Sequence, residues 1–155
     1  MKNKCCIVNG LAFVIALFAS AHCAHAALGG SADTVGADRK ALSASHRATT
    51  SHGGYTVEEM ASDATTVREY VSPSGTVFGI AWNGYVHPDL TRLLGSYAGQ
   101  FTAARQKAAR IIGSRHLHLA TENIIVEKWG HMRDLRGRAY APKLFPKGVT
   151  SNEIK

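Results

Sequence analysis

Alternating apolar and polar positions are clearest between residues 65 and 82. Residues 65–71 and 76–82 alternate with a period of two, which is the spacing of a β-strand that buries one face. Between them lies Ser72-Pro73-Ser74-Gly75, whose proline and glycine are typical of a tight turn. The pattern therefore predicts a β-hairpin.

A helical spacing of apolar residues follows this hairpin. Pro88 suits the first turn of a helix, and apolar residues then recur at intervals of three and four. They form a single stripe: Leu90, Leu93, Leu94, Tyr97, Phe101, Ala104, Ala108, Ile111 and Ile112. We therefore expect one long amphipathic helix over residues 89–112. Gly95 and Gly99 would lie opposite the stripe, where another segment approaches closely.

The remaining segments predict one short helix and several strands. The helix is expected over residues 35–42, capped by Asp33 or Thr34. Strands are expected over residues 55–60, 116–120, 123–129 and 132–140, with a turn at Gly130, a loop or weak edge strand over 43–54, and an irregular tail from Pro142 to Lys155. The expected fold class is α+β: an antiparallel sheet with one long amphipathic helix packed on it, plus a short N-terminal helix.

The first 26 residues have the pattern of a secretory signal peptide. Lys2 and Lys4 precede an apolar run, and Ala24-His25-Ala26 supplies the small residues that signal peptidase requires. We expect cleavage after Ala26 and a periplasmic or extracellular protein with no transmembrane segment. The alternative is an uncleaved membrane anchor, but the apolar core from Leu11 to Ala21 is short for a span of about 20 residues.

Cleavage would remove every cysteine, because Cys5, Cys6 and Cys23 all precede residue 27. The remaining chain, residues 27–155, would be a single domain without thiols. This excludes a disulfide framework, a thiol nucleophile and a thiolate metal site in the exported form. We expect no resident cofactor, since neither a βαβ alternation nor a phosphate-binding glycine loop is present.

Charge is distributed unevenly along the chain. Residues 27–89 carry four basic and seven acidic residues, whereas residues 90–155 carry twelve basic and four acidic ones. The basic half is compatible either with a surface for an anionic partner or with ordinary solvated arginines. Because the chain is expected to be exported, no nucleic-acid partner is expected.

Several segments resemble a known family. They are Ala27-Leu28-Gly29-Gly30, Thr66-Val67-Arg68-Glu69-Tyr70-Val71-Ser72-Pro73, Gly75, Val77-Phe78, Ile80-Ala81-Trp82, Gly84, Pro88-Asp89-Leu90, Leu94-Gly95, Tyr97, Gly130-His131-Met132-Arg133 and Gly137-Arg138-Ala139-Tyr140. In these the chain resembles DUF2844, an uncharacterised family of bacterial secreted or periplasmic proteins. The resemblance would cover essentially all of residues 27–155. It implies a small exported protein and no particular activity.

Arginine and tyrosine recur together on two predicted strands, as Arg68 with Tyr70 and Arg138 with Tyr140. If the two strands are neighbours, these side chains would line a groove for an anionic or sugar-like ligand, with His131 as a further candidate. The alternative is cross-strand ion pairing of the arginines with Glu69 or Asp134.

His116 and His118 are two residues apart on a predicted strand, so both rings project to the same face. Two imidazoles in this arrangement can bind Zn²⁺ or Cu²⁺, with His131, Glu122 or Glu127 as a third ligand. The alternative is an ordinary amphipathic strand whose histidines face water.

The leading functional hypothesis is a non-enzymatic exported module that binds an envelope protein or an anionic envelope component. Neither a GxSxG nor an HExxH motif is present. Two alternatives remain. One is an envelope hydrolase, which requires His131, Arg133 or Arg138 to converge with a carboxylate. The other is a metal-binding protein that uses His116 and His118.

Overall fold

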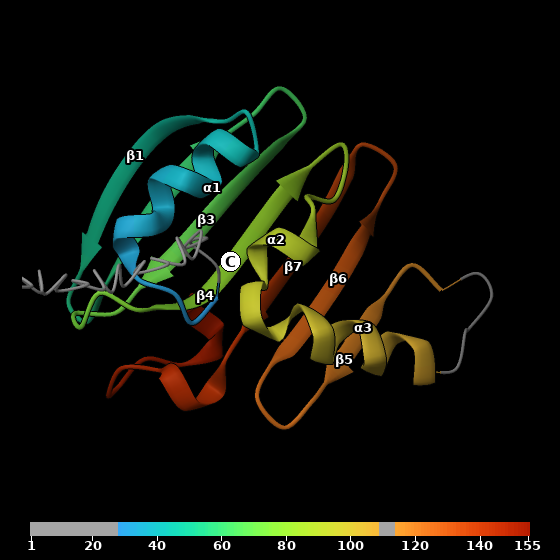
Figure 1. Cartoon of the computed structure of the whole chain (residues 1–155). Helices are drawn as coiled ribbons and strands as arrows, with labels where there is room; N and C mark the ends of the chain where they lie inside the picture. Colours follow the sequence, from blue (N-terminus) through green and yellow to red (C-terminus); the bar gives the residue numbers. More distant parts are fainter. Residues whose placement is uncertain (1–27, 109–113) are drawn as a thin grey trace, which may run out of the picture.

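The fold of the chain is a seven-stranded antiparallel sheet with short helices against one face (Figure 1). The computed structural model describes residues 28–108 and 114–155. The strands are β1 (Ser45–His52), β2 (Tyr55–Ala61), β3 (Thr65–Val71), β4 (Val77–Gly84), β5 (Leu117–Ala120), β6 (Ile125–His131) and β7 (Asp134–Tyr140). The helices are α1 (Val35–Ala41), α2 (Leu90–Leu93) and α3 (Ala98–Lys107). Short 3₁₀ turns are η1 (Ala32–Thr34), η2 (Gly95–Tyr97), η3 (Pro142–Leu144) and η4 (Ser151–Glu153).

Two antiparallel meanders join at the centre of the sheet. The strand order is β1-β2-β3-β4-β7-β6-β5, so β4 closes the first meander and pairs with β7 of the second. The pairing runs from Gly79 opposite Tyr140 to Gly84 opposite Leu135. Strands β3 and β7, far apart in the sequence, therefore lie on either side of β4.

The predicted hairpin of β3 and β4 is confirmed. The main-chain nitrogen of Gly75 donates to the oxygen of Ser72 at 2.9 Å, which closes the turn. Gly75 has a φ of +78°, a conformation that glycine adopts readily. The strand expected over residues 55–60 is also present as β2, and the weak edge strand as β1, which is exposed along its whole length.

The main core lies between the helices and the first face of the sheet. Strands contribute Met60, Val67, Ile80, Trp82 and Val126, and the helical segment contributes Leu90, Leu93, Leu94 and Phe101. All of these side chains are at most 7% exposed. Their burial attaches the helical layer to the sheet and leaves the second face for other contacts.

The prediction of one long helix over residues 89–112 is wrong. The segment divides into α2, η2 and α3, and the break falls at Gly95, whose φ of +50° interrupts right-handed helix geometry. Within α3 the buried residue is Phe101, and the chain leaves the helix after Lys107 with an extended Ala108. Residues 109–112 lie outside the described residues. The fold class is thus mainly β, and the α+β description with a long packed helix is corrected.

Three smaller expectations also change. Within residues 28–108 and 114–155, no atom outside the backbone of α3 lies within 4 Å of where a Cβ on Gly99 would lie, so no described segment approaches it closely. The turn between β6 and β7 consists of Met132 and Arg133, because His131 pairs with Asp134 and Gly130 belongs to β6. The N-terminal helical segment is capped by Ser31.

The expected signal peptide, residues 1–26, lies outside the described residues. Within residues 28–108 and 114–155, no helix combines the length and apolar character needed to cross a membrane.

Candidate functional site

The second face of the sheet brings the predicted arginines and tyrosines together. Arg68 and Arg138 are both register partners of Ala81, one from each side of β4. Tyr70 and Tyr140 are likewise the two register partners of Gly79, which lies two residues before Ala81 on β4. The strands that carry them are separated by β4 and are not direct neighbours. The four residues nevertheless share one face, because their strands alternate in the same phase.

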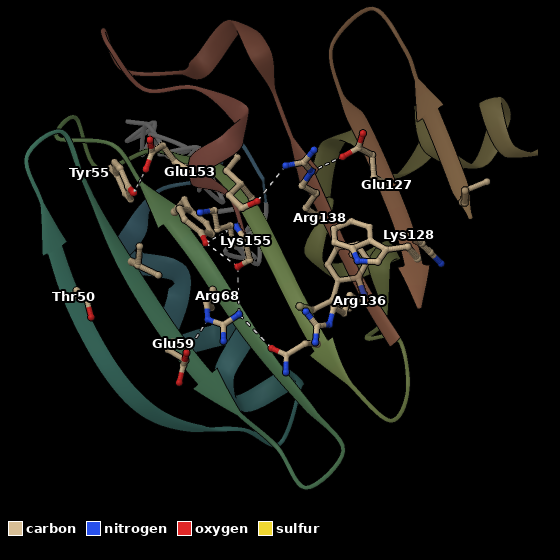
Figure 2. A pocket seen from close by; sticks show the side chains of 18 of the residues that line it. Thr50, Tyr55, Glu59, Arg68, Glu127, Lys128, Arg136, Arg138, Glu153 and Lys155 are labelled. Carbon is tan, nitrogen blue, oxygen red and sulfur yellow. Dashed lines mark hydrogen bonds and ion pairs between the residues drawn. The ribbon is translucent and has the colours of Figure 1, made fainter. Parts of the chain in front are cut away.

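A groove of about 1130 Å³ runs across this face (Figure 2). Its lining comes from all seven strands and from the C-terminal segment. Polar and aromatic lining residues include Thr50, Glu59, Arg68, Asn83, Trp129 and Arg136. The volume is slightly above the roughly 300–1,000 Å³ of typical ligand pockets.

Each of the two predicted arginines forms a cross-strand ion pair. The Nε of Arg68 donates to Glu59 Oε2 at 2.8 Å, and its Nη1 donates to Asn83 Oδ1 at 3.2 Å. The Nε of Arg138 donates to a carboxylate oxygen of Glu127. The alternative of cross-strand ion pairing is therefore realised, but with Glu59 and Glu127 as partners.

The two carboxylates suggested earlier as partners have other positions. Asp134 accepts from Arg136 Nε at 2.8 Å, and Glu69 is completely buried opposite Ile80.

Burial raises the pKa of Glu127, but the hydrogen bonds and charges of Arg138 and His118 together outweigh burial and hold that pKa below its usual range. Glu127 is therefore ionised and fixes the orientation of Arg138.

The same arginines also hold the end of the chain against the sheet. Arg138 Nη1 donates to the main-chain oxygens of Ser151 and Ile154 at 2.9 and 3.3 Å. Arg68 Nη1 donates to the main-chain oxygen of Lys155 at 3.3 Å. The donors that were expected to bind a ligand thus bind a segment of this same chain, as Figure 2 shows.

The two tyrosines have different environments. The Tyr70 hydroxyl accepts from the main-chain nitrogen of Lys155 and donates to its oxygen, both at 3.0 Å. Burial raises the pKa of Tyr70, so its hydroxyl stays protonated and available as a donor. Tyr140 is buried, with Phe145 packed against its ring at 5.8 Å and the Arg138 guanidinium 5.7 Å from the ring centroid.

His131 is not part of the groove lining. It is exposed at the end of β6, with Nδ1 3.4 Å from the main-chain oxygen of Met132. Arg133 lies in the adjacent turn, whereas Arg138 lies on β7 four residues beyond Asp134, a separation of roughly 13 Å along an extended strand. Of the three residues named for the hydrolase alternative, Arg138 meets a carboxylate in the groove, that of Glu127, whereas His131 and Arg133 lie at the β6–β7 turn.

The histidine pair lies at the rim of the groove. His118 is exposed on β5, and its Nδ1 is 3.1 Å from Glu127 Oε1; His116 precedes the strand. Among the residues that the structure describes, no group of three or more histidine, cysteine, aspartate or glutamate side chains is arranged to hold a metal ion. The carboxylate that His118 contacts, Glu127, already binds Arg138.

Sequence reasoning missed several residues of this site. Asn83, Arg136 and Trp129 line the groove because of the strand order, which no local pattern reveals. Ile154 and Lys155 were expected to be irregular tail. One signal was present: a glycine inside a strand, such as Gly79, often marks a close approach of another segment.

The family comparison covers the groove and almost all of the C-terminal segment. The family described as "Protein of unknown function (DUF2844)" matches residues 24–154. No curated protein and no solved structure matches the chain significantly. The chain belongs to the DUF2844 family, whose function is unknown.

Proposed function

We propose that this protein is an exported, non-enzymatic binding module that holds a segment of a partner protein in the groove on the second face of the sheet. The observation that carries the proposal is what the groove already binds. Arg68, Tyr70 and Arg138 donate hydrogen bonds to main-chain oxygens of a peptide segment. A surface with this chemistry suits polypeptide, because every peptide unit offers the same acceptor.

The size and composition of the groove support a polypeptide ligand. The volume of about 1130 Å³ leaves room beside the C-terminal segment for several residues of a partner. Among the charged lining residues, five are cationic and three are anionic: Arg68, Lys128, Arg136, Arg138 and Lys155 against Glu59, Glu127 and Glu153. The excess of positive charge favours a partner segment that carries acidic residues.

Export is the second part of the proposal, and residues 1–26 support it by their basic, apolar and small-residue order. The test is to express the full gene product in a bacterial host and determine the N-terminus of the protein recovered from the periplasm or medium. We expect Ala27 as the first residue. A protein that stays in the cytoplasm and retains Cys23 would refute this part.

The binding surface is tested with two variants of equal charge change. Arg136→Glu alters the groove at a half-exposed side chain that contacts only Asp134 among the described ion pairs, and Lys107→Glu alters the exposed end of α3. Each variant and the wild type are immobilised and exposed to a solubilised envelope fraction. We expect at least one protein to be captured by the wild type and by Lys107→Glu, and captured at least about tenfold less by Arg136→Glu.

Two outcomes contradict the proposal. The first is capture that is equal for both variants, or absent for all three. The second is binding to phosphatidylglycerol vesicles or to a sulfated polysaccharide that depends on Arg136 in the absence of any captured protein. That second result would assign the groove to an anionic envelope component.

A further inference from the structure

Residues 151–155 occupy part of the groove in the manner of a bound peptide. We name the surface beneath them the tail strip, and it consists of Tyr55, Arg68, Tyr70, Gly79 and Arg138. These residues come from β2, β3, β4 and β7, so the strip crosses the centre of the sheet. Figure 2 shows the segment lying over these strands, with its end near Arg68.

The strip contacts the main chain of the segment at Ser151, Ile154 and Lys155. Arg138 binds the oxygens of Ser151 and Ile154, and Arg68 binds the oxygen of Lys155. The Tyr70 hydroxyl donates to the main-chain oxygen of Lys155 and accepts from its main-chain nitrogen. These contacts do not depend on side-chain identity, so a different sequence in the same conformation would satisfy them equally.

Side-chain recognition is concentrated at Ile154. Its side chain is 1% exposed and packs with Tyr70, Phe78 and Tyr140. The space exists because β4 has a glycine at this row: a Cβ on Gly79 would lie 2.5 Å from Ile154 Cδ1 and 3.2 Å from Cγ1. We call this space, between Tyr70 and Tyr140 and above Gly79, the slot. It selects an aliphatic side chain of about the size of isoleucine.

The side chain of Glu153 is also recognised, next to the slot. The Tyr55 hydroxyl donates to Glu153 Oε2 at 3.1 Å. Burial raises the pKa of Tyr55, and the hydrogen bond and charge of Glu153 raise it further, so the hydroxyl stays protonated and available as the donor. The strip thus matches an acidic residue followed by an aliphatic one.

The chain upstream of the segment has its own contacts with the sheet. Phe145 packs against Phe78 at 5.2 Å and against Tyr140 at 5.8 Å, which fixes the chain upstream. Gly148, with a φ of +82°, then redirects it towards the strip. Release of residues 149–155 would withdraw Val149 and Ile154 from the aromatic cluster and expose the strip, whereas Phe145 keeps its contacts with Phe78 and Tyr140.

We propose that the tail strip is a peptide-recognition site, which residues 151–155 fill in the resting protein and which an extended partner segment with an acidic–aliphatic pair fills when they leave. The inference rests on the proposed function and specifies the partner's chemistry and its competition with the tail. A tethered segment has an effective concentration of about millimolar, so a free segment competes only when the tail is weakened or the partner binds tightly.

The test uses the full chain and a fluorescent peptide with the sequence of residues 150–155. In Ile154→Asp the tail loses its aliphatic side chain while the strip is unchanged. We expect this variant to bind the peptide at least about tenfold more tightly than the wild type, measured by fluorescence anisotropy. Adding Gly79→Ala should abolish the gain, since the new Cβ fills the slot. The nearest other atom to that Cβ is Tyr70 Cβ at 3.7 Å, so the strand itself tolerates the change.

Two controls are needed to interpret the peptide-binding result. Hydrogen exchange of residues 151–155 must rise in Ile154→Asp while that of β3, β4 and β7 does not. A peptide with aspartate in place of isoleucine should bind none of the proteins. If Ile154→Asp unfolds the protein, Ile154→Ala is used with the same expectations.

The proposal is overturned if a folded variant with a released tail does not bind the peptide, or binds it equally with Gly79→Ala present. It also fails if neither variant releases the tail, because the slot then does not hold it. Peptide binding without any Arg136-dependent partner capture would reject the proposed function alone. Capture that survives in the absence of peptide binding would reject this inference alone.

Discussion

Replacing Gly137 by alanine should destabilise the protein strongly, because Gly137 lies against the indole ring of Trp82 at the junction of the two meanders. An added Cβ would lie 2.3 and 2.6 Å from Cζ2 and Cε2 of Trp82, and 2.7 Å from the main-chain oxygen of Glu127. Carbon atoms in contact are normally about 3.5–4.0 Å apart. The methyl group therefore needs about 1 Å of movement from the ring and a smaller movement from the neighbouring strand.

Neither neighbour can move easily. Trp82 is 2% exposed, and its indole nitrogen donates to His87 Nδ1 at 2.9 Å. The Glu127 oxygen belongs to β6, which pairs with β7 at this position. Overpacking a core costs about 1–3 kcal/mol, and loss of the indole hydrogen bond adds about 1 kcal/mol. We expect the free energy of unfolding to fall by about 3 kcal/mol, a large part of the roughly 5–15 kcal/mol typical of a domain.

The matched control is Gly99→Ala in α3, where no atom lies within 4 Å of the new methyl group. Alanine favours a helix over glycine by roughly 0.5–1 kcal/mol, so this variant should be slightly more stable than the wild type. Urea unfolding and thermal unfolding, each followed by circular dichroism, measure both variants. Gly137→Ala should lower the melting temperature by about 10 °C. A change below about 2 °C would refute the packing of Trp82 on Gly137.

Two further outcomes are expected. Burial, and to a lesser extent Lys128, lowers the pKa of His87, so the unfolded chain takes up a proton first as pH falls below about 6.5. The free energy of unfolding should therefore decrease from about pH 7 to pH 5, and the decrease should be smaller in His87→Gln; parallel pH profiles would contradict this. Phe101→Ala should cost about 3 kcal/mol and raise hydrogen exchange in α3 but not in β3, because Phe101 is the buried anchor of that helix. Unchanged exchange in α3 would show that other contacts hold it.

Local patterns predicted the hairpin and failed for the helix, and the difference has a physical cause. Residues 65–82 alternate and flank a proline–glycine turn, so neighbouring residues alone determine the hairpin. The helical stripe was real as far as Phe101, since Leu90, Leu93, Leu94 and Phe101 are all buried. Gly95 adopts a positive φ, which redirects the chain so that these residues cover the sheet from two short helices. The spacing of the apolar residues does not indicate that bend.

The candidate site was predictable in its residue types and not in its layout. Alternation places Arg68 with Tyr70, and Arg138 with Tyr140, on one face of their own strands. Whether the two faces coincide depends on β4 pairing with β7, a contact between residues about sixty positions apart along the chain. The similar composition of β3 and β7 is compatible with several strand orders. The burial of Ile80 and Trp82 under the helices favours the order in which β4 lies between them.

The ion pairs and the peptide contacts of the two arginines support each other. Glu59 and Glu127 bind the Nε of Arg68 and Arg138, which fixes each guanidinium and leaves Nη1 directed at the C-terminal segment. When that segment leaves, both arginines keep a carboxylate partner, so no positive charge is left without compensation. The cost of exposing the groove then comes from the main-chain contacts, the hydrogen bond between Tyr55 and Glu153 and the burial of Ile154. A partner that restores those contacts meets donors already held in position, which reduces the ordering needed to bind.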